Sequence, residues 1–149
     1  MITNRDKQYL RAVFLLGGAS EPVGPKKLAI KMGVTKVCAF QKMRRLEAMG
    51  YGEYEHRRGL KLNNKGVFEI EQDIKKHHIL EKFLQETLQM TSQEACDHSN
   101  HIGPFVGDVL LNDISNKMNF RMECDCGYCL DASKNFAELE HCHWLKKSF

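Results

Sequence analysis

The segment LAIKMGVTKVCAFQKMRRLEAMG, residues 28–50, decides the fold of this chain. It indicates a short helix that stops at Gly33 and a longer helix that Thr35 can cap and Gly50 can close. Ala29 precedes Gly33 by four residues, so a small side chain stands where the two helices cross. A helix, a tight turn with glycine and a second helix together form a helix-turn-helix.

The flanking segments extend this motif on both sides. Apolar residues at helical spacing predict a helix over residues 5–16, ahead of the short helix at 25–32. After the motif, YGEYEHRRGLKLNNKG, residues 51–66, indicates two short strands around a basic turn. Such a hairpin completes a winged helix-turn-helix domain, which we assign to residues 1–65.

We expect residues 66–149 to form a second, helical domain with a short cysteine-rich tail, so the fold is predicted to be mostly α. The expected helices run from Asn63 or Asn64 to about residue 89, from a cap at Thr91 or Ser92 through CDHSNH at 96–101, and from Phe105 to Met118. The tail from Asn119 indicates a strand, a cysteine cluster and a helix near 132–145.

Charge divides the chain in the same way. Residues 1–65 contain 14 Lys/Arg and 5 Asp/Glu, a balance of +9, whereas residues 66–149 contain 8 and 14, a balance of −6. A basic domain joined to an acidic one indicates that the basic part binds a polyanion. On a winged helix-turn-helix this partner is double-stranded DNA. A winged domain used only for protein contacts is the alternative, but it does not require clustered basic residues.

The second helix of the motif and the basic turn supply the predicted DNA contacts. Small, polar and apolar groups in the first turns of the helix could meet base edges and thymine methyl groups, while arginines and Lys61 meet phosphates. The predicted DNA-binding residues are Thr35, Lys36, Val37, Cys38, Phe40, Gln41, Arg44, Arg45, Arg57 and Arg58.

Neither a membrane segment nor a secretion signal is evident. No apolar run approaches the roughly 20 residues that cross a bilayer, and MITNRDKQYL has no signal-peptide pattern. We therefore expect a cytoplasmic protein without a membrane partner. Its six cysteines should then stay reduced and available to metals, whereas a secreted chain would pair them as disulfides.

The tail combines three thiols in ECDCGYC with the sequence HCH. Three thiolates could converge around Gly127, and a ligand from HCH could close a tetrahedral structural zinc site. The predicted tail ligands are Cys124, Cys126, Cys129, His141 and Cys142. An iron–sulfur cluster or free, reduced cysteines are the alternatives.

Several stretches together resemble the metal-dependent repressors typified by the diphtheria toxin repressor and the manganese transport regulator. They are QYLRAVFLL, the helix-turn-helix quoted above, EYEHRRGLKLNNKG, KKHHILEKFL and EAC, within residues 5–118. The resemblance implies a winged domain followed by a helical dimerisation domain. It also implies a divalent iron or manganese ion as corepressor and a homodimer on a palindromic operator.

The resemblance carries the family's metal ligands over unevenly. It implies His77 and Glu81, whose four-residue spacing puts both side chains on one helical face, and it implies Cys96. The family's remaining ligand positions fall on residues that differ from the family pattern: Gln8, Ser92, Ser99 and Asn100.

His98 and His101 lie one position away from where the family pattern expects an acid and a histidine. A one-residue slip would bring Asp97, Asn100 and His101 into the ligand positions, but it would put Cys96 out of line, so we favour the register without a slip. His98 and His101 remain candidate ligands. The alternative is that CDHSNH is a solvated helix face with Cys96 buried as a small apolar residue.

These patterns predict a metal-dependent transcriptional repressor, activated by iron or manganese, that binds palindromic operator DNA as a homodimer. In one variant of this hypothesis, sensing has moved wholly or partly to the tail thiolates. The alternative is a redox- or thiol-responsive winged-helix regulator with structural zinc, in which Cys38 and the tail thiols react. An enzyme is not expected, because the chain has no HExxH or comparable set of firm zinc ligands.

Overall fold

The computed structural model describes residues 1–118 and 144–145. The predicted tail ligands Cys124, Cys126, Cys129, His141 and Cys142 therefore lie outside the described residues. The chain divides into two compact units, one comprising Met1–Glu71 with Leu145–Phe149 and the other Gln72–Trp144.

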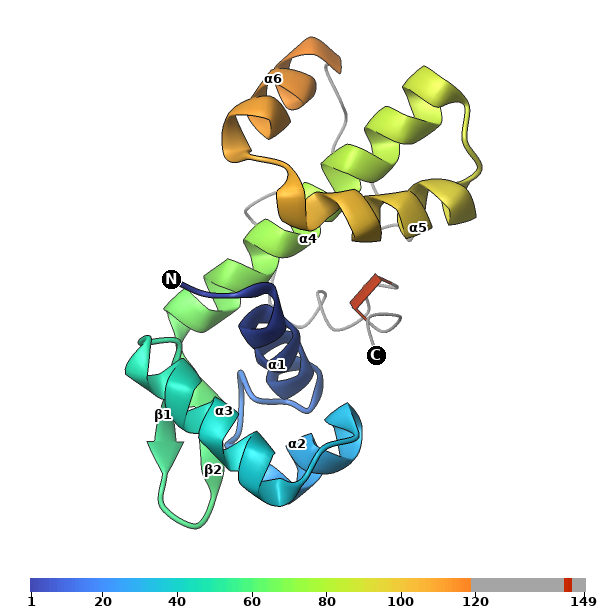
Figure 1. The fold of residues 1–149 in the computed structure, drawn as a ribbon. Coiled ribbons are helices and arrows are strands. Elements are labelled where there is room, and N and C mark those ends of the chain that lie inside the picture. The colour runs from blue at the N-terminus through green and yellow to red at the C-terminus, as the bar shows by residue number, and fades with distance from the viewer. Residues whose placement is uncertain (119–143, 146–149) are drawn as a thin grey trace. The chain divides into compact units, whose positions relative to one another are not determined.

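The first unit is a winged helix-turn-helix, as predicted (Figure 1). Its elements are α1 (Asn4–Leu15), α2 (Pro25–Met32), α3 (Lys36–Ala48), β1 (Gly52–Glu55), β2 (Gly59–Leu62) and the first turns of α4 (Asn64–Leu88). The helix-turn-helix consists of α2 and α3, and the strands form an antiparallel hairpin with Gly52 opposite Leu62 and Glu55 opposite Gly59.

Local signals set the ends of these helices. Thr3 and Asp6 form a capping box at the start of α1, and the Thr35 hydroxyl accepts a hydrogen bond from the backbone N–H of Cys38 at the start of α3. Gly33 ends α2 in the left-handed conformation at φ +63°, which glycine adopts without strain. The turn that the sequence predicted is therefore built as expected.

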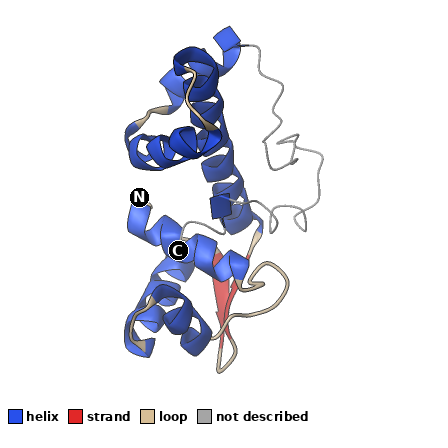
Figure 2. Ribbon diagram, turned by 90° about the vertical axis from the view of Figure 1, so that its right-hand side faces the viewer, coloured by secondary structure: helices blue, strands red, loops and turns tan. Residues whose placement is uncertain are grey.

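Buried apolar side chains join the three helices to the hairpin. The fully buried residues of this core include Tyr9, Leu10, Phe14, Leu28, Met43, Leu46 and Leu60. Val23 pairs with Leu60 through two backbone hydrogen bonds of 2.9 and 3.0 Å, so the loop before α2 runs along the hairpin shown in red in Figure 2. Gly59 permits this approach: its φ is +125°, and a Cβ there would lie 1.9 Å from the carbonyl oxygen of Val23.

The second unit contains the rest of α4, α5 (Ser92–Ile102), a 3₁₀ turn (Gly103–Phe105) and α6 (Asp108–Met118). A capping box of Thr91 and Glu94 starts α5. The helix predicted from Phe105 to Met118 begins at Asp108, three residues later than expected. Proline at position 104 is accommodated at the start of the 3₁₀ turn, where its missing N–H costs no helical hydrogen bond.

Among the described residues of the second unit, one apolar cluster joins α4 to α6. Ile79 and Leu80 of α4 pack on Leu111 of α6, with Val106 and Ile114 at the edge. Several large apolar side chains stay exposed nearby: Ile102, Phe105, Val109 and Leu110. Among the described helices, none has the length and apolar character needed to span a bilayer.

Candidate nucleic-acid interface and metal centre

One side of α3 faces away from the core and carries most of the residues predicted to contact DNA. Thr35, just before the helix, and Lys36, Val37, Phe40, Gln41 and Arg44 on it are all exposed. Exposed Val37 and Phe40 are costly in water, since they are large apolar side chains without core packing. This face offers cations, an amide and apolar groups, which are the groups that read a major groove.

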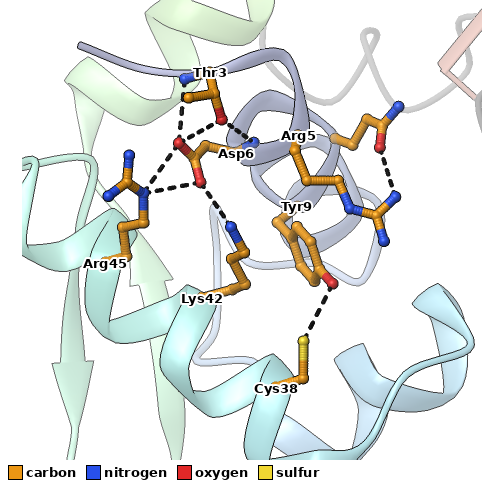
Figure 3. Close-up of polar contacts among 8 residues, drawn as sticks. Thr3, Arg5, Asp6, Tyr9, Cys38, Lys42 and Arg45 are labelled. Carbon is orange, nitrogen blue, oxygen red and sulfur yellow. Dashed lines mark hydrogen bonds and ion pairs between the residues drawn. The ribbon is translucent and has the colours of Figure 1, made fainter.

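Two of the predicted DNA-binding residues, Cys38 and Arg45, face α1 instead (Figure 3). With Lys42 they form a stripe at spacings of four and three residues along α3. Arg45 Nε lies 3.0 and 3.1 Å from the two carboxylate oxygens of Asp6, and Lys42 Nζ lies 3.2 Å from Asp6 Oδ1. Arg45 therefore contributes to the packing of α3 on α1, while half of its side chain stays exposed.

Asp6 is the buried centre of this contact. It also accepts hydrogen bonds from the backbone N–H and the hydroxyl of Thr3, at 3.1 and 2.7 Å. Burial raises the pKa of Asp6, but the hydrogen bonds from Thr3, Arg45 and Lys42 outweigh that effect and hold the pKa well below its usual value. The carboxylate is therefore charged across the physiological range and ties α1 to α3.

Cys38 lies beside Tyr9 rather than on the outer face of α3. The Cys38 Sγ and Tyr9 hydroxyl are 3.7 Å apart, and the Arg5 guanidinium lies 5.3 Å from the centre of the Tyr9 ring. Burial raises the pKa of Tyr9, and the neighbouring Cys38 thiol adds to the effect. Cys38 is half-buried, so reagents reach it less easily than they reach the exposed residues of α3.

An aromatic contact joins α3 to the hairpin. The rings of Phe40 and Tyr54 meet edge to face at 5.4 Å, and the Arg44 guanidinium lies 5.7 Å from the centre of the Tyr54 ring. Glu47 pairs with Arg44 at 2.6 Å and accepts the backbone N–H of Tyr54 at 3.0 Å. These contacts hold the orientation of the hairpin against the exposed face of α3.

The two arginines of the hairpin turn differ in their surroundings. Arg58 pairs with Glu55 at 2.6 Å and with Glu21 at 3.1 Å. Arg57 is exposed, has a φ of +63° and forms no ion pair with the described residues. Arg57 is therefore the more available cation of the two.

The predicted ligands of the helical unit meet at His77. Its Nε2 lies 3.5 Å from Cys96 Sγ on α5 and 3.6 Å from Glu81 Oε2, one turn further along α4. His77 and Cys96 are buried, and Glu81 also lies 3.2 Å from Nδ1 of His78. Cys96 is thus the α5 side chain that faces His77, which fits the register without a slip.

Each of these two distances, taken alone, fits two ligands of one shared metal ion. Two ligands of one tetrahedral ion, with bonds of about 2.0–2.3 Å, lie about 3.3–3.6 Å apart. Within residues 1–118 and 144–145, however, no three His, Cys, Asp or Glu side chains form one group that could hold an ion. Thiol, imidazole and carboxylate are donors that fit a divalent metal. In the described residues they form two close pairs, His77 with Cys96 and His77 with Glu81.

The other candidate ligands of the helical unit, His98 and His101, are exposed on α5. His101 Nδ1 lies 2.7 Å from the backbone carbonyl of Asp97. On α1, Gln8 stands at a position where the family pattern has a ligand, and its side chain accepts a hydrogen bond from Arg5 at 3.1 Å.

The sequence did not indicate one neighbour of His77. Trp144 stacks on the imidazole ring, with ring centres 4.6 Å apart and planes 18° from parallel. Its indole N–H donates to Oδ1 of Asn100. An isolated tryptophan near the end of a sequence has no periodicity or spacing that could relate it to α4.

Comparison with known proteins identifies the first unit. Residues 1–60 match the family described as iron-dependent repressor, N-terminal DNA-binding domain. No curated protein is similar enough to the chain to count as a match.

Similar solved structures share the fold over more of the chain. A hypothetical protein from Sulfolobus solfataricus is 19% identical with a TM-score of 0.77, over 87% of this chain and 99% of that one. ScaR with bound Zn²⁺ is 21% identical with a TM-score of 0.73, over 85% of this chain and 59% of its own. A manganese-dependent transcriptional repressor in complex with manganese is 23% identical with a TM-score of 0.65, over 86% and 59%.

The chain thus spans about three fifths of the length of ScaR and of the manganese-dependent repressor. The matched domain is a DNA-binding one, in line with the expectation that the chain is not an enzyme. The resemblance predicted from the sequence is supported over the first 60 residues, which match the N-terminal DNA-binding domain of the iron-dependent repressors.

Proposed function

We propose that this chain is a metal-dependent transcriptional repressor that binds operator DNA as a homodimer. The observation that carries the metal dependence is the position of His77 Nε2, within 3.6 Å of both a thiol and a carboxylate. These side chains follow, in the same chain, a DNA-binding domain of the iron-dependent repressor family. A divalent ion would supply a positive centre that holds α4 to α5.

Three side chains would hold the ion: Cys96 as a thiolate, His77 through Nε2 and Glu81 as a carboxylate. A thiolate is a soft donor that suits iron or zinc better than manganese, while a carboxylate suits all three. The donor set therefore favours Fe²⁺ over Mn²⁺ as corepressor. In the tail, Cys124, Cys126, Cys129, His141 and Cys142 remain proposed ligands of a structural Zn²⁺.

DNA would be bound by the exposed face of α3 in the major groove, with Arg57 and Arg58 of the hairpin on phosphates. Val37 and Phe40 stand where thymine methyl groups could replace water around them. Because each phosphate contact releases counterions, the affinity should fall steeply with salt. Arg45 keeps about half of its side chain exposed and could add a phosphate contact while it stays paired with Asp6.

The homodimer would form through the second unit. Ile102, Phe105, Val109 and Leu110 lie exposed within nine consecutive residues, a density of apolar side chains that marks contact surfaces. A second copy of the same surface would bury these side chains in a twofold interface. Two winged domains related by a twofold axis suit a palindromic operator.

A thiol-responsive regulator is the second candidate. Cys38 lies on α3, next to the DNA-facing side chains, so its oxidation would alter the packing of α3 on Tyr9. Neither Cys38 nor Cys96 forms a disulfide within the described part of the chain. This alternative predicts that peroxide reversibly weakens DNA binding in chelated, metal-free buffer.

The test begins with selection of bound duplexes from a random DNA pool. The selected duplex is then titrated with the protein under anaerobic conditions, with Fe²⁺, Mn²⁺, Zn²⁺ or a chelator. We expect at least one ion to tighten binding, and His77→Ala to remove that response. His98→Ala, at an exposed histidine of α5, is the matched control. Equal affinity with metal and with chelator would refute metal dependence, and peroxide sensitivity under those conditions would support the thiol alternative.

A further inference from the structure

Trp144 is the only tryptophan of the chain and covers one face of His77. The indole is 7% exposed and the imidazole beneath it 3% exposed. The rings are nearly parallel, at 18°, which is the offset-stacked arrangement that aromatic pairs favour. The indole therefore shields the ring that the proposed metal site depends on.

A hydrogen bond fixes the indole within its own plane. Trp144 Nε1 donates to Asn100 Oδ1 on α5, and an indole has no other polar hydrogen. The stack sets the plane of the ring, and the bond sets its rotation within that plane. The two contacts leave one orientation of Trp144 over His77, and they use residues of both α4 and α5.

We propose that Trp144 is a positioning residue of the metal centre: seated between His77 and Asn100, it holds the imidazole so that Nε2 points at Cys96 and Glu81. This inference rests on the proposed metal dependence and adds Trp144 to the site. Trp144 cannot be a ligand itself, because the indole nitrogen carries a proton and offers no lone pair. It acts only through the His77 ring.

The contacts around His77 explain why such support is needed. A terminal imidazole torsion is broad and does not fix the ring by itself. The His78 ring meets His77 edge to face at 5.5 Å, whereas Trp144 lies flat on it at 4.6 Å. Removal of the indole would free the imidazole to rotate and would admit water to a buried donor. Outer partners that orient a metal-binding histidine typically change metal affinity 10- to 100-fold.

The coupling must act in both directions. If a seated Trp144 strengthens metal binding, a bound ion strengthens the seating of Trp144 by the same factor. The position of Trp144 therefore depends on whether the metal centre is filled. Because no other tryptophan is present, all the tryptophan fluorescence of the chain comes from this residue.

The first test uses the full native chain and tryptophan fluorescence. Iodide should quench the emission far less than it quenches free N-acetyltryptophanamide. Addition of Mn²⁺ or Co²⁺ should change the emission with the same midpoint as metal uptake measured by calorimetry. Emission that is open to iodide, or that is unchanged while the protein takes up metal, would overturn the proposal.

The second test compares metal affinity among variants. Trp144→Ala should weaken binding of Co²⁺ about tenfold or more, and Trp144→Phe, which keeps a stacking face, should recover most of that loss. Asn100→Ala should weaken binding less than Trp144→Ala and should increase iodide quenching. Asn112→Ala, at an exposed asparagine of α6, is the matched control and should change neither quantity.

The Co²⁺ absorption spectrum separates positioning from mere stability, because it reports the ligand set of bound metal. We expect Trp144→Ala to alter this spectrum and Trp144→Phe to restore it. If Trp144→Ala does not fold, the Asn100→Ala and Asn112→Ala comparison decides. Affinity of Trp144→Ala within twofold of the native value would refute this inference alone, whereas a native chain that binds no divalent metal would refute the proposed function as well.

Discussion

Substitution of Asp6 by alanine should destabilise the first unit more than any other loss of a single charge on α1. Asp6 is 1% exposed and accepts hydrogen bonds from Thr3, Lys42 and Arg45 (Figure 3). Alanine removes the acidic half of the capping box and both links to α3. The change creates little cavity and keeps a good helix-forming residue, so the lost polar contacts dominate the effect.

The magnitude follows from the exposure of the partners. A capping interaction contributes about 1 kcal/mol. The side chains of Lys42 and Arg45 are 29% and 49% exposed, so each ion pair is screened by water and contributes about 0.5–1 kcal/mol. Both cations can turn to solvent after the substitution and leave no buried charge. We therefore expect Asp6→Ala to lower the free energy of unfolding by about 2–3 kcal/mol.

Urea unfolding followed by circular dichroism measures this change. The midpoint should fall while the slope m stays constant, since the surface exposed on unfolding is nearly the same. Glu53→Ala is the control, because Glu53 is exposed on β1, and it should change the free energy by less than about 0.5 kcal/mol. A loss below 1 kcal/mol for Asp6→Ala would show that the contacts in Figure 3 do not hold α1 to α3 in solution.

The pH dependence of the stability that Asp6 contributes gives an independent check, with Asp6→Asn as the variant. The folded pKa of Asp6 is depressed below its ordinary value of 3.8, so its stabilising contribution is complete well above pH 4. The contribution is lost as the pH falls below 4, because folding then opposes protonation of this carboxylate. The difference in unfolding free energy between the native chain and Asp6→Asn should thus be constant from pH 6 to 8 and shrink between pH 5 and 2. A constant difference down to pH 2 would contradict the depressed pKa.

Four further outcomes are expected. Arg57→Ala combined with Arg58→Ala should weaken binding to all duplexes alike and lower the salt slope by about 2. Arg57→Ala alone should cause most of this decrease in slope, because Arg58 is paired with two carboxylates. A loss of affinity confined to one sequence would contradict a phosphate role. Phe40→Ala should abolish the sensitivity of the selected duplex to replacement of single thymines by deoxyuridine, measured as the affinity ratio of the two duplexes. Gly59→Ala should lower the free energy of unfolding by at least about 2 kcal/mol in urea, since the new Cβ would meet the Val23 carbonyl at 1.9 Å. Phe105→Asp should shift the sedimentation coefficient from dimer to monomer at micromolar concentration, and an unchanged coefficient would place the dimer contact elsewhere.

The fold of the first unit could be predicted because its signals are local. Gly33 in the left-handed conformation, the Thr35 cap and the hairpin after Gly50 each depend on a few neighbouring residues. The start of α6 was predicted three residues too early, at Phe105 instead of Asp108. The reason is also local, because Gly103–Phe105 forms a separate 3₁₀ turn whose apolar residues continue the helical pattern of α6.

The orientation of α3 was harder to predict than its presence. Helical spacing identifies the buried stripe of Ala39, Met43 and Leu46, but it assigns every polar position outside that stripe to solvent. Cys38 and Arg45 lie beside the stripe and face α1. There Cys38 contacts Tyr9 and Arg45 pairs with Asp6. A buried aspartate in the first turn of α1 gives no sequence signal of its own, because the same residue type is common there as a cap.

In the candidate metal centre, too, the local features could be predicted and the tertiary contacts could not. The four-residue spacing of His77 and Glu81 is a helical property and places the two side chains on one face of α4, 3.6 Å apart. The approach of Cys96 followed from the family resemblance, whereas Trp144 lies far along the chain and reaches His77 only through tertiary structure. Spacing rules cannot identify such a partner, because stacking requires no fixed separation in sequence.

The strength of the Asp6 contact also limits how metal could control DNA binding. Allosteric coupling between two sites is typically 1–3 kcal/mol, and rupture of the two ion pairs that join Asp6 to α3 would cost about 1–2 kcal/mol. A metal-driven rearrangement of α3 against α1 would therefore consume much of the coupling free energy that an ion can provide. If the ion acts without breaking these bonds, no coupling free energy is spent on them. We therefore expect the first unit to respond to the ion as one rigid body. Under this mechanism Asp6→Ala lowers stability and DNA affinity equally with and without metal, and the ratio of the two affinities stays constant. A ratio that changes more than threefold would indicate that the α1–α3 contact itself is the regulated element.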